Sequence, residues 1–188
     1  MRRAGSLFAR FLDWAGVGWP EGLEWPDRPG EPARVDLALP EEDYERLLRA
    51  IPTFPMAHHR PFLQALIPFL GETGLDYRGE SLLVRGRRTR EALEAWLPLR
   101  DYLASLHPIP YPHLFLRTSE GPERGKPWSL GALVPLVRAL FKHAGLDHVK
   151  NKPLALRYRA VRRLFGRGYP KEKVAYFVGI KRVAQGWE

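Results

Sequence analysis

The chain of 188 residues contains no cysteine, one asparagine (Asn151), two glutamines and two methionines. Without cysteine it can form no disulfide bond, thiolate nucleophile or cysteine-based metal centre. No apolar run reaches the ~20 residues that a membrane-spanning helix requires. The apolar stretch near the N-terminus is interrupted by Arg10 and Asp13, so it predicts an amphipathic helix rather than a signal peptide. We therefore expect a cytoplasmic protein without a membrane partner.

The scarcity of amide and sulfur-containing side chains, together with abundant Arg, Glu and Pro, is typical of proteins from thermophiles. A GC-rich genome favours the same residues, so both explanations stay open. Hydrophobic residues make up 45% of the chain and charged residues 27%, which is ordinary for a globular protein. The length fits one domain with a small appendage.

The positive charge is concentrated at one end of the chain. From Lys142 onward there are twelve Lys or Arg and three acids, whereas the first 141 residues hold 18 basic and 18 acidic residues. The net charge of +9 therefore belongs to the last quarter of the sequence. A basic face on a folded segment is the electrostatic signature of a polyanion partner, most often nucleic acid. An Arg-rich surface that serves only solubility is the alternative.

Most of the sequence predicts helices. Residues 7–15 carry apolar side chains at helical spacing, and Leu39–Ile51 begins with a proline and acids, as helix N-termini prefer. Residues 18–32 contain four Pro and three Gly, a composition typical of a linker. Further helices are expected at Arg60–Leu70, at Leu99–Leu106, from Ser129 as N-cap to a stop at Gly145, at Pro153–Phe165 and at Pro170–Val178.

One segment predicts a β-hairpin. Residues 81–84 read Ser-Leu-Leu-Val and residues 92–99 read Ala-Leu-Glu-Ala-Trp-Leu-Pro-Leu, two apolar runs joined by the basic turn 85–90. The glycine in this turn supports the hairpin. Its turn would carry a group of basic side chains available to phosphate groups, namely Arg85, Arg87, Arg88 and Arg90.

Helical-wheel positions place one arginine among apolar side chains. At 100° per residue, Arg157 lies in the middle of the apolar arc of the helix Pro153–Phe165. The other arginines of this helix, Arg159, Arg162 and Arg163, lie on the opposite side and are expected to face solvent. An arginine in an apolar arc is either paired, directed into a pocket, or extended to the surface from the first turn. The residue positions alone leave these alternatives open.

The run from Asn151 to Ile180 resembles the end of the catalytic domain of tyrosine recombinases, the phage integrase family. That family reads P-H-x-L-R-H, a helix, a glycine and a second helix ending in L-G-H. Upstream motifs keep the family order: residues 39–48 are similar to T-x-E-E-x-x-x-L-L, residues 66–75 to L-L-Y-x-T-G-L, residues 83–91 to R-G-K-G-x-K-x-R, and residues 114–122 to L-F-x-S-x-x-G-x-P. The resemblance covers nearly the whole chain, and the order of its motifs is the main support.

The resemblance implies a fold like the tyrosine-recombinase catalytic domain, mainly α with a small antiparallel β-sheet (α+β). Residues 1–17 would then be a residual helix of the family's DNA-clamping domain. Residues 18–38 would be the interdomain linker, and residues 39–188 the integrase catalytic-like domain.

The catalytic residues of the family are only partly retained. Arg157 matches the second catalytic arginine, which contacts the scissile phosphate, so here it would be a relic phosphate ligand. The histidine before it is replaced by Leu154 and the histidine after it by Tyr158. Asp76 follows T-G-L in place of the first arginine, and Gly179-Ile180 replaces the late G-H. Arginines stand at the hairpin lysine, and a guanidinium is a poor proton donor.

The nucleophile of the family is also displaced. Counted from Ile180, the tyrosine would fall just past Glu188, and Tyr176 lies one turn too early. The covalent DNA intermediate requires an oxygen nucleophile. We therefore expect a pseudoenzyme that does not cleave DNA strands on its own.

Other polar groups suggest no separate chemistry. Adjacent His58 and His59 would face different ways on a helix and have no carboxylate at i+3 or i+4, so we interpret them as surface residues rather than a metal site. Glu41-Glu42-Asp43 is interpreted as a helix-start acidic cluster. The sequence contains no G-x-x-x-x-G-K loop and no G-x-S-x-G turn, and we expect no metal and no cofactor.

The leading hypothesis is a degenerate tyrosine recombinase that binds duplex DNA and is associated with the nucleoid. Alternatives are a subunit of a hetero-oligomeric recombinase that receives its tyrosine from a partner, an RNA- or protein-binding module on a recycled fold, and a decayed gene fragment. Another copy of this chain or a full-length recombinase would be the protein partner. The phosphate contacts would come from the turn arginines 85, 87, 88 and 90 and from Lys150, Lys152, Arg159, Lys181 and Arg182.

Overall fold

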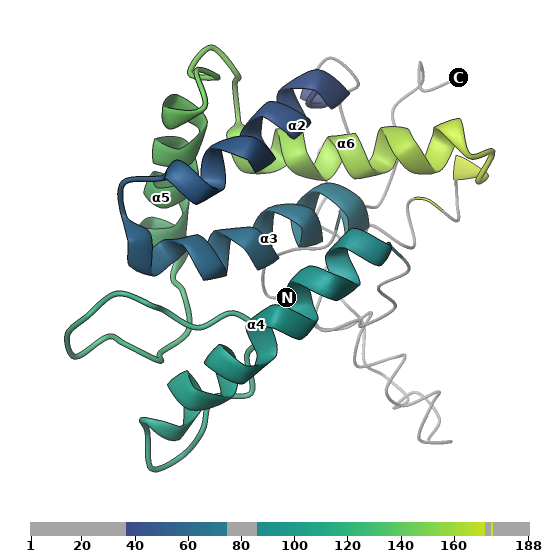
Figure 1. Ribbon diagram of the computed structural model, residues 1–188. Helices are drawn as coiled ribbons and strands as arrows, with labels where there is room; N and C mark the ends of the chain where they lie inside the picture. Colours follow the sequence, from purple (N-terminus) through teal and green to yellow (C-terminus); the bar gives the residue numbers. More distant parts are fainter. Residues whose placement is uncertain (1–36, 75–85, 172–173, 175–188) are drawn as a thin grey trace, which may run out of the picture.

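The computed structural model describes residues 37–74, 86–171 and 174 (Figure 1). The predicted helix 7–15, linker 18–32, strand 81–84 and most of the helix Pro170–Val178 lie outside these residues, as do Arg85, Lys181 and Arg182. The described residues form helices α2 (Glu41–Ala50), α3 (Arg60–Thr73), α4 (Arg87–Ser105), α5 (Leu130–His143) and α6 (Lys152–Gly166), with two short 3-10 helices, η2 (Ile51–Thr53) and η3 (Ala57–His59).

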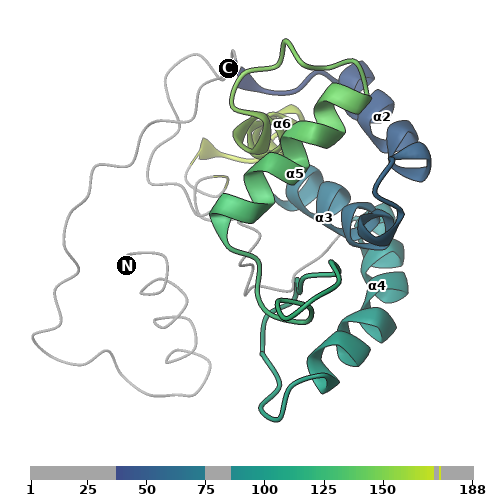
Figure 2. The ribbon, with the colours of Figure 1, turned by 90° about the vertical axis from the view of Figure 1, so that its left-hand side faces the viewer.

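Helix α3 is the centre of the described fold. It packs most extensively against α4 and α6, and it also contacts α2. Figures 1 and 2 show it between α4 on one side and α2 with α6 on the other. All residues from Ala65 to Gly71 are buried, which is why its sequence is apolar on every side rather than along one stripe. Proline stands in its first turn and again at Pro68, and the helix continues past both.

Aromatic rings fill the space between α3, α4 and the segment that leads to α5. Phe62 stacks on Trp128 with ring centroids 4.8 Å apart, and its edge contacts Trp96 and Phe115. The indole N–H groups of both tryptophans are satisfied, because Trp96 donates to the carbonyl of Leu114 at 2.8 Å and Trp128 to that of Leu116 at 3.0 Å. This core holds α4 and the loop before α5 against α3.

Several helix predictions are confirmed. Helix α2 begins directly after the predicted proline, Pro40, and has Glu41, Glu42 and Asp43 in its first turn. Ser129 is the N-cap of α5, and its Oγ accepts a hydrogen bond from the N–H of Ala132 at 3.3 Å. Gly145 follows α5 with a φ of 71°, a left-handed conformation that glycine adopts at little energetic cost.

The predicted hairpin strand at residues 92–99 is wrong, because these residues lie inside α4. Leu93, Trp96 and Leu103 are buried whereas Leu97 is exposed, so the apolar residues follow a helical period. Residues 87–90 of the basic turn form the first turn of this helix, and Arg87 pairs with Glu91 at i,i+4 with a distance of 2.7 Å. The helix also accommodates Pro98 in its interior, a residue that favours a break in sequence-based reasoning.

The small antiparallel sheet is not confirmed by the described residues. Their β-structure is one isolated antiparallel bridge between Leu116 and Pro127. Arg117 flanks it, donating its N–H to the carbonyl of Lys126 at 2.9 Å and accepting from the N–H of Gly125 at 2.9 Å. Within the same residues, every helix is too short or too polar to cross a membrane.

Candidate nucleic-acid interface

Helix α6 carries the arginine that matches the family motif. Arg157 is only 8% exposed, in agreement with its predicted place in the apolar arc. Its neighbours Leu156 and Ala160 belong to the buried part of the helix. The burial of Arg157 is thus confirmed, and its assignment as a phosphate ligand stays a prediction.

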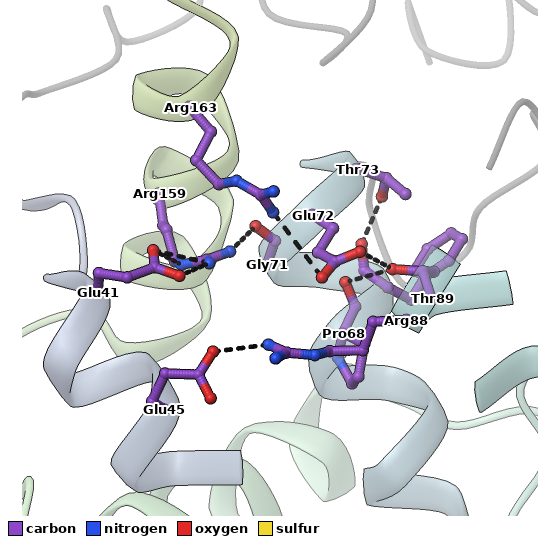
Figure 3. A network of polar contacts seen from close by, with 11 residues as sticks. Glu41, Glu45, Pro68, Gly71, Glu72, Thr73, Arg88, Thr89, Arg159 and Arg163 are labelled. Atoms are coloured by element: carbon purple, nitrogen blue, oxygen red, sulfur yellow. Dashed lines mark hydrogen bonds and ion pairs between the residues drawn. The ribbon is translucent and has the colours of Figure 1, made fainter. Parts of the chain in front are cut away.

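The prediction that Arg159 faces solvent is wrong. Its side chain is 3% exposed and forms a two-pronged contact with Glu41, with Nε 3.0 Å from Oε2 and Nη2 2.6 Å from Oε1. The remaining nitrogen, Nη1, donates to the carbonyl of Gly71 at 2.7 Å. One side chain of α6 therefore joins the start of α2 to the end of α3, and all three of its nitrogens are engaged (Figure 3).

The Arg159 guanidinium also lies over the ring of Tyr44, 3.4 Å from its centroid. The same ring lies against Gly71, where an added Cβ would come within 2.6 Å of a ring carbon. Burial is the main cause that raises the pKa of Tyr44 to about 12. Gly71, Tyr44 and Arg159 therefore form a stack in which glycine supplies the necessary space.

More than one arginine lowers the pKa of Glu41. Partial burial of its carboxyl opposes ionisation, but the hydrogen bonds and charge of Arg159, together with the charges of Arg163 and Arg88, leave its pKa below the ordinary value. These three arginines thus belong to one electrostatic cluster around the start of α2. Nearby positive charges favour the ionised form of a carboxylate.

A second carboxylate of the cluster is buried at the end of α3. The Glu72 side chain is 9% exposed, and its Oε2 accepts a hydrogen bond of 2.6 Å from Thr89 Oγ1 in the first turn of α4. The same hydroxyl lies 3.2 Å from the carbonyl of Pro68. On the other side of the carboxylate, Arg163 Nη1 lies 3.8 Å from Oε1, an ion-pair distance that exceeds a hydrogen bond.

The turn arginines differ in their surroundings. Arg88 Nη1 donates to Glu45 Oε1 at 2.7 Å, and both side chains are partly exposed. Arg87 is paired with a carboxylate of its own helix, whereas Arg90 is exposed and forms no ion pair within the described residues. Figure 3 shows the pairs from α2, α3, α4 and α6 meeting at one junction, which we call the arginine–carboxylate cluster: Glu41, Glu45, Glu72, Arg88, Arg159 and Arg163.

The two predicted lysines before α6 also differ. Lys150 is exposed. The side chain of Lys152 is 11% exposed, because its Nζ donates at 2.9 Å to the carbonyls of both Asp147 and Val149 and lies 3.6 Å from the Asp147 carboxylate. Lys152 therefore stabilises the turn between α5 and α6 rather than standing free for phosphate.

The predicted phosphate contacts omit part of the exposed basic surface, including Arg162, whose predicted exposure is confirmed. Arg138 and Lys142 are exposed on α5 and are four residues apart, so they lie on one side of that helix. Arg162 and Arg167 are exposed in and just after α6. Within the described part of the chain none of these four cations forms an ion pair with a carboxylate. The i,i+4 spacing on α5 is the signal that could have identified the first two.

The interpretation of His59 as a surface residue is wrong. His59 is 7% exposed, its Nδ1 lies 2.7 Å from Thr118 Oγ1, and its Nε2 lies 3.1 Å from Nε2 of His58. Burial, followed by the positive charges of His58 and Arg117, lowers its pKa to about 4. The imidazole is therefore neutral at neutral pH and connects η3 to the loop before α5.

Structural comparison identifies recombinases. The chain is similar to the site-specific recombinase XerH in a pre-cleavage complex with its difH substrate, with a TM-score of 0.58 and 20% identity over 77% of this chain and 47% of that one. It is also similar to XerH in a post-cleavage complex with palindromic difH, with a TM-score of 0.58, 18% identity and coverage of 95% and 58%. XerA recombinase gives a TM-score of 0.56, 16% identity and coverage of 93% and 64%.

The chain thus spans about half to two thirds of the length of these recombinases. No family model matches the sequence, and no curated protein matches it significantly. At identities of 16–20%, the similarity establishes the fold. The chain has the fold of the tyrosine recombinases, which is the fold that the order of its sequence motifs predicts.

Proposed function

We propose that this protein binds duplex DNA through the exposed cations of α5, α6 and the turn between them, and that it does not cleave DNA by itself. The observation that carries the proposal is the distribution of unpaired charge on a recombinase fold. Exposed cations without a carboxylate partner in the described residues gather in this part of the chain: Arg138, Lys142, Lys150, Arg162 and Arg167.

The arginines elsewhere contribute less unpaired charge. Arg87, Arg88, Arg159 and Arg163 each face a carboxylate, so their charge is at least partly neutralised before DNA arrives. Arg49 and Arg90 are exposed without an ion pair in the described residues, and they could extend the basic surface toward α2 and α4. DNA in the XerH complexes supports DNA as the polyanion.

Replacement of the two α5 cations tests the location of the interface. If all five cations of α5 and α6 contact phosphates, the plot of log K against log salt has a slope of about −4 to −5. Arg138→Gln with Lys142→Gln removes two contacts and reduces the size of this slope by about 2. The measurement is fluorescence anisotropy on a labelled random-sequence duplex across a salt series.

The matched control is Arg46→Gln with Arg87→Gln, which removes the same charge from residues that pair with Asp43 and Glu91. We expect the control to change the slope by less than half as much. Equal effects of the two double variants would show that only net charge matters and that the α5 face is not the interface.

The lack of cleavage is inferred from the residues at the motif positions. Leu154 and Tyr158 stand where the family has histidines. The side chain of Leu154 has no hydrogen-bond donor, and a phenol can donate a hydrogen bond but cannot supply the positive charge of an imidazolium. A nicked suicide duplex, incubated with the protein alone and with a full-length recombinase, checks this. We expect no covalent protein–DNA adduct from this chain, and an adduct formed by the chain alone would overturn the proposal.

A further inference from the structure

The arginine–carboxylate cluster contains two kinds of ion pair. Arg159 is buried and uses every guanidinium nitrogen, on Glu41 and on the carbonyl of Gly71. Arg88 meets Glu45 through one nitrogen at the surface. Arg163 lies 3.8 Å from Glu72, whose own hydrogen bond comes from Thr89. The arginine of the pair Arg159–Glu41 is therefore buried and held by several hydrogen bonds, whereas Arg88–Glu45 and Arg163–Glu72 are each held by a single contact.

Resting on the proposed function, we propose that Arg88 and Arg163 form a second phosphate-binding site for the DNA backbone, which Glu45 and Glu72 hold closed. The ligand is a phosphate oxygen, since a guanidinium binds phosphate and carboxylate with the same fork of donors. Opening exchanges a carboxylate partner for a phosphate partner. No bond is made or broken other than hydrogen bonds and ion pairs.

The geometry favours exchange at these two arginines. A partly exposed ion pair contributes little to stability, because water competes with both partners. The side chains of Arg88 and Glu45 are 49% and 38% exposed, so rotation of these side chains at the surface is enough to separate them. Arg163 uses none of its donors in a hydrogen bond within the described residues, and its side chain is about one-third exposed. Both guanidinium groups can therefore turn toward an incoming anion.

The location supports a backbone phosphate as the ligand. The cluster joins α2, the end of α3, the first turn of α4 and the second half of α6. Arg163, in the last turn of α6, is adjacent in sequence to the exposed Arg162 of the proposed interface. Arg88 and Arg163 both act on the carboxyl of Glu41, so they belong to one neighbourhood. A duplex bound along α6 would bring phosphates near Arg163 first.

Neutralising the carboxylates tests this inference. Glu45→Gln and Glu72→Gln each remove the competing charge and keep the shape of the side chain. We expect each to raise duplex affinity roughly two- to fivefold and to steepen the salt slope by about 1, measured as for the wild type. Glu94→Gln is the matched control, because Glu94 is exposed on α4 and the change in net charge is identical.

Double variants separate competition from general electrostatics. If the inference holds, Arg88→Gln abolishes the gain of Glu45→Gln, and Arg163→Gln abolishes the gain of Glu72→Gln. Gains no larger than that of Glu94→Gln would overturn the inference while leaving DNA binding by the wild type intact. Absence of wild-type binding would instead refute the proposed function.

Two further measurements complete the test: a check that each variant is folded, and a second ligand. Thermal unfolding checks each variant, and if the buried Glu72→Gln variant is unfolded, the half-exposed Glu45→Gln variant carries the decision. Inorganic phosphate at constant ionic strength is the second probe. A gain seen with duplex DNA alone assigns the site to the nucleic-acid backbone, whereas a gain confined to inorganic phosphate overturns that assignment.

Discussion

Arg159 provides the sharpest prediction about stability. Replacing it with alanine removes a charge-assisted hydrogen bond to the carbonyl of Gly71, an ion pair with Glu41 and the contact over the Tyr44 ring. Hydrogen bonds to charged groups contribute about 1.5–3 kcal/mol. The ion pair adds only about 1 kcal/mol, because the Glu41 side chain is 62% exposed, and the ring contact adds about 1 kcal/mol.

We therefore expect Arg159→Ala to lower the free energy of unfolding by about 3–5 kcal/mol, which corresponds to a fall in Tm of about 10 °C for a chain of this size. Arg159→Lys should recover about half of the loss, since one ammonium group cannot reach both Glu41 and Gly71 in the same fork. Arg162→Ala, on the exposed side of the same helix, is the control and should change stability by less than about 0.5 kcal/mol.

The assay is urea unfolding followed by circular dichroism, with thermal scans as a second measure. If Arg159→Ala lowers the free energy of unfolding by less than about 1 kcal/mol, or by no more than Arg162→Ala does, the proposed stabilising role of Arg159 is refuted. Such a result would mean that α6 is held by apolar packing alone. None of the three ion pairs of the cluster would then be shown to stabilise the fold.

Three other changes test the surroundings of the cluster and the buried histidine. The pKa of His59 is about 4 in the folded state, against an ordinary value of 6.5. Between these pH values the unfolded chain binds a proton that the folded chain does not, so the free energy of unfolding should fall as the pH decreases from 6.5 to 4, by at most about 3 kcal/mol. His59→Asn should flatten this dependence in urea titrations, and an unchanged pH profile would contradict the prediction. Gly71→Ala should lower the free energy of unfolding by about 1–3 kcal/mol through the clash with Tyr44. Gly131→Ala should be tolerated, because an added Cβ meets open space there. Equal losses for the two variants in thermal scans would contradict the close packing of Gly71 against Tyr44. Tyr44→Phe should leave stability unchanged or raise it by up to about 1 kcal/mol, because the buried hydroxyl has no hydrogen-bond partner within the described residues; a clear loss in the same scans would show that the hydroxyl is satisfied.

The sequence predicts the parts of this fold that depend on local signals. Ser129 before α5, the proline before α2 with the acids of its first turn, and the buried arc of α6 can all be predicted from neighbouring residues. The prediction for α4 is wrong because two apolar runs around a glycine-containing turn, together with the family motif, suggest a hairpin. The burial of Leu93 and Trp96 shows that helical spacing is the stronger signal there.

The cluster itself could not be predicted from the sequence. Arg159 meets Glu41 across 118 residues and Gly71 across 88 residues, and no periodicity reports pairings at such separations. A helical wheel divides α6 into one buried and one exposed side, but α6 packs on α3 while Arg159 reaches α2. Polar residues become buried when a helix is covered from two directions. Lys152 and His59 are covered by other contacts that the sequence does not reveal: Lys152 bonds to the carbonyls of Asp147 and Val149, and His59 lies against Thr118 and the Trp128 ring.

The most direct test of the proposed function is the salt dependence of binding between the unmodified protein and a labelled random-sequence DNA duplex. The account predicts binding that weakens linearly in log salt, with a slope of about −4 to −5. A folded protein that shows no binding near physiological ionic strength, or binding that does not respond to salt, would contradict it. In that case the basic surface of α5 and α6 serves a partner other than duplex DNA.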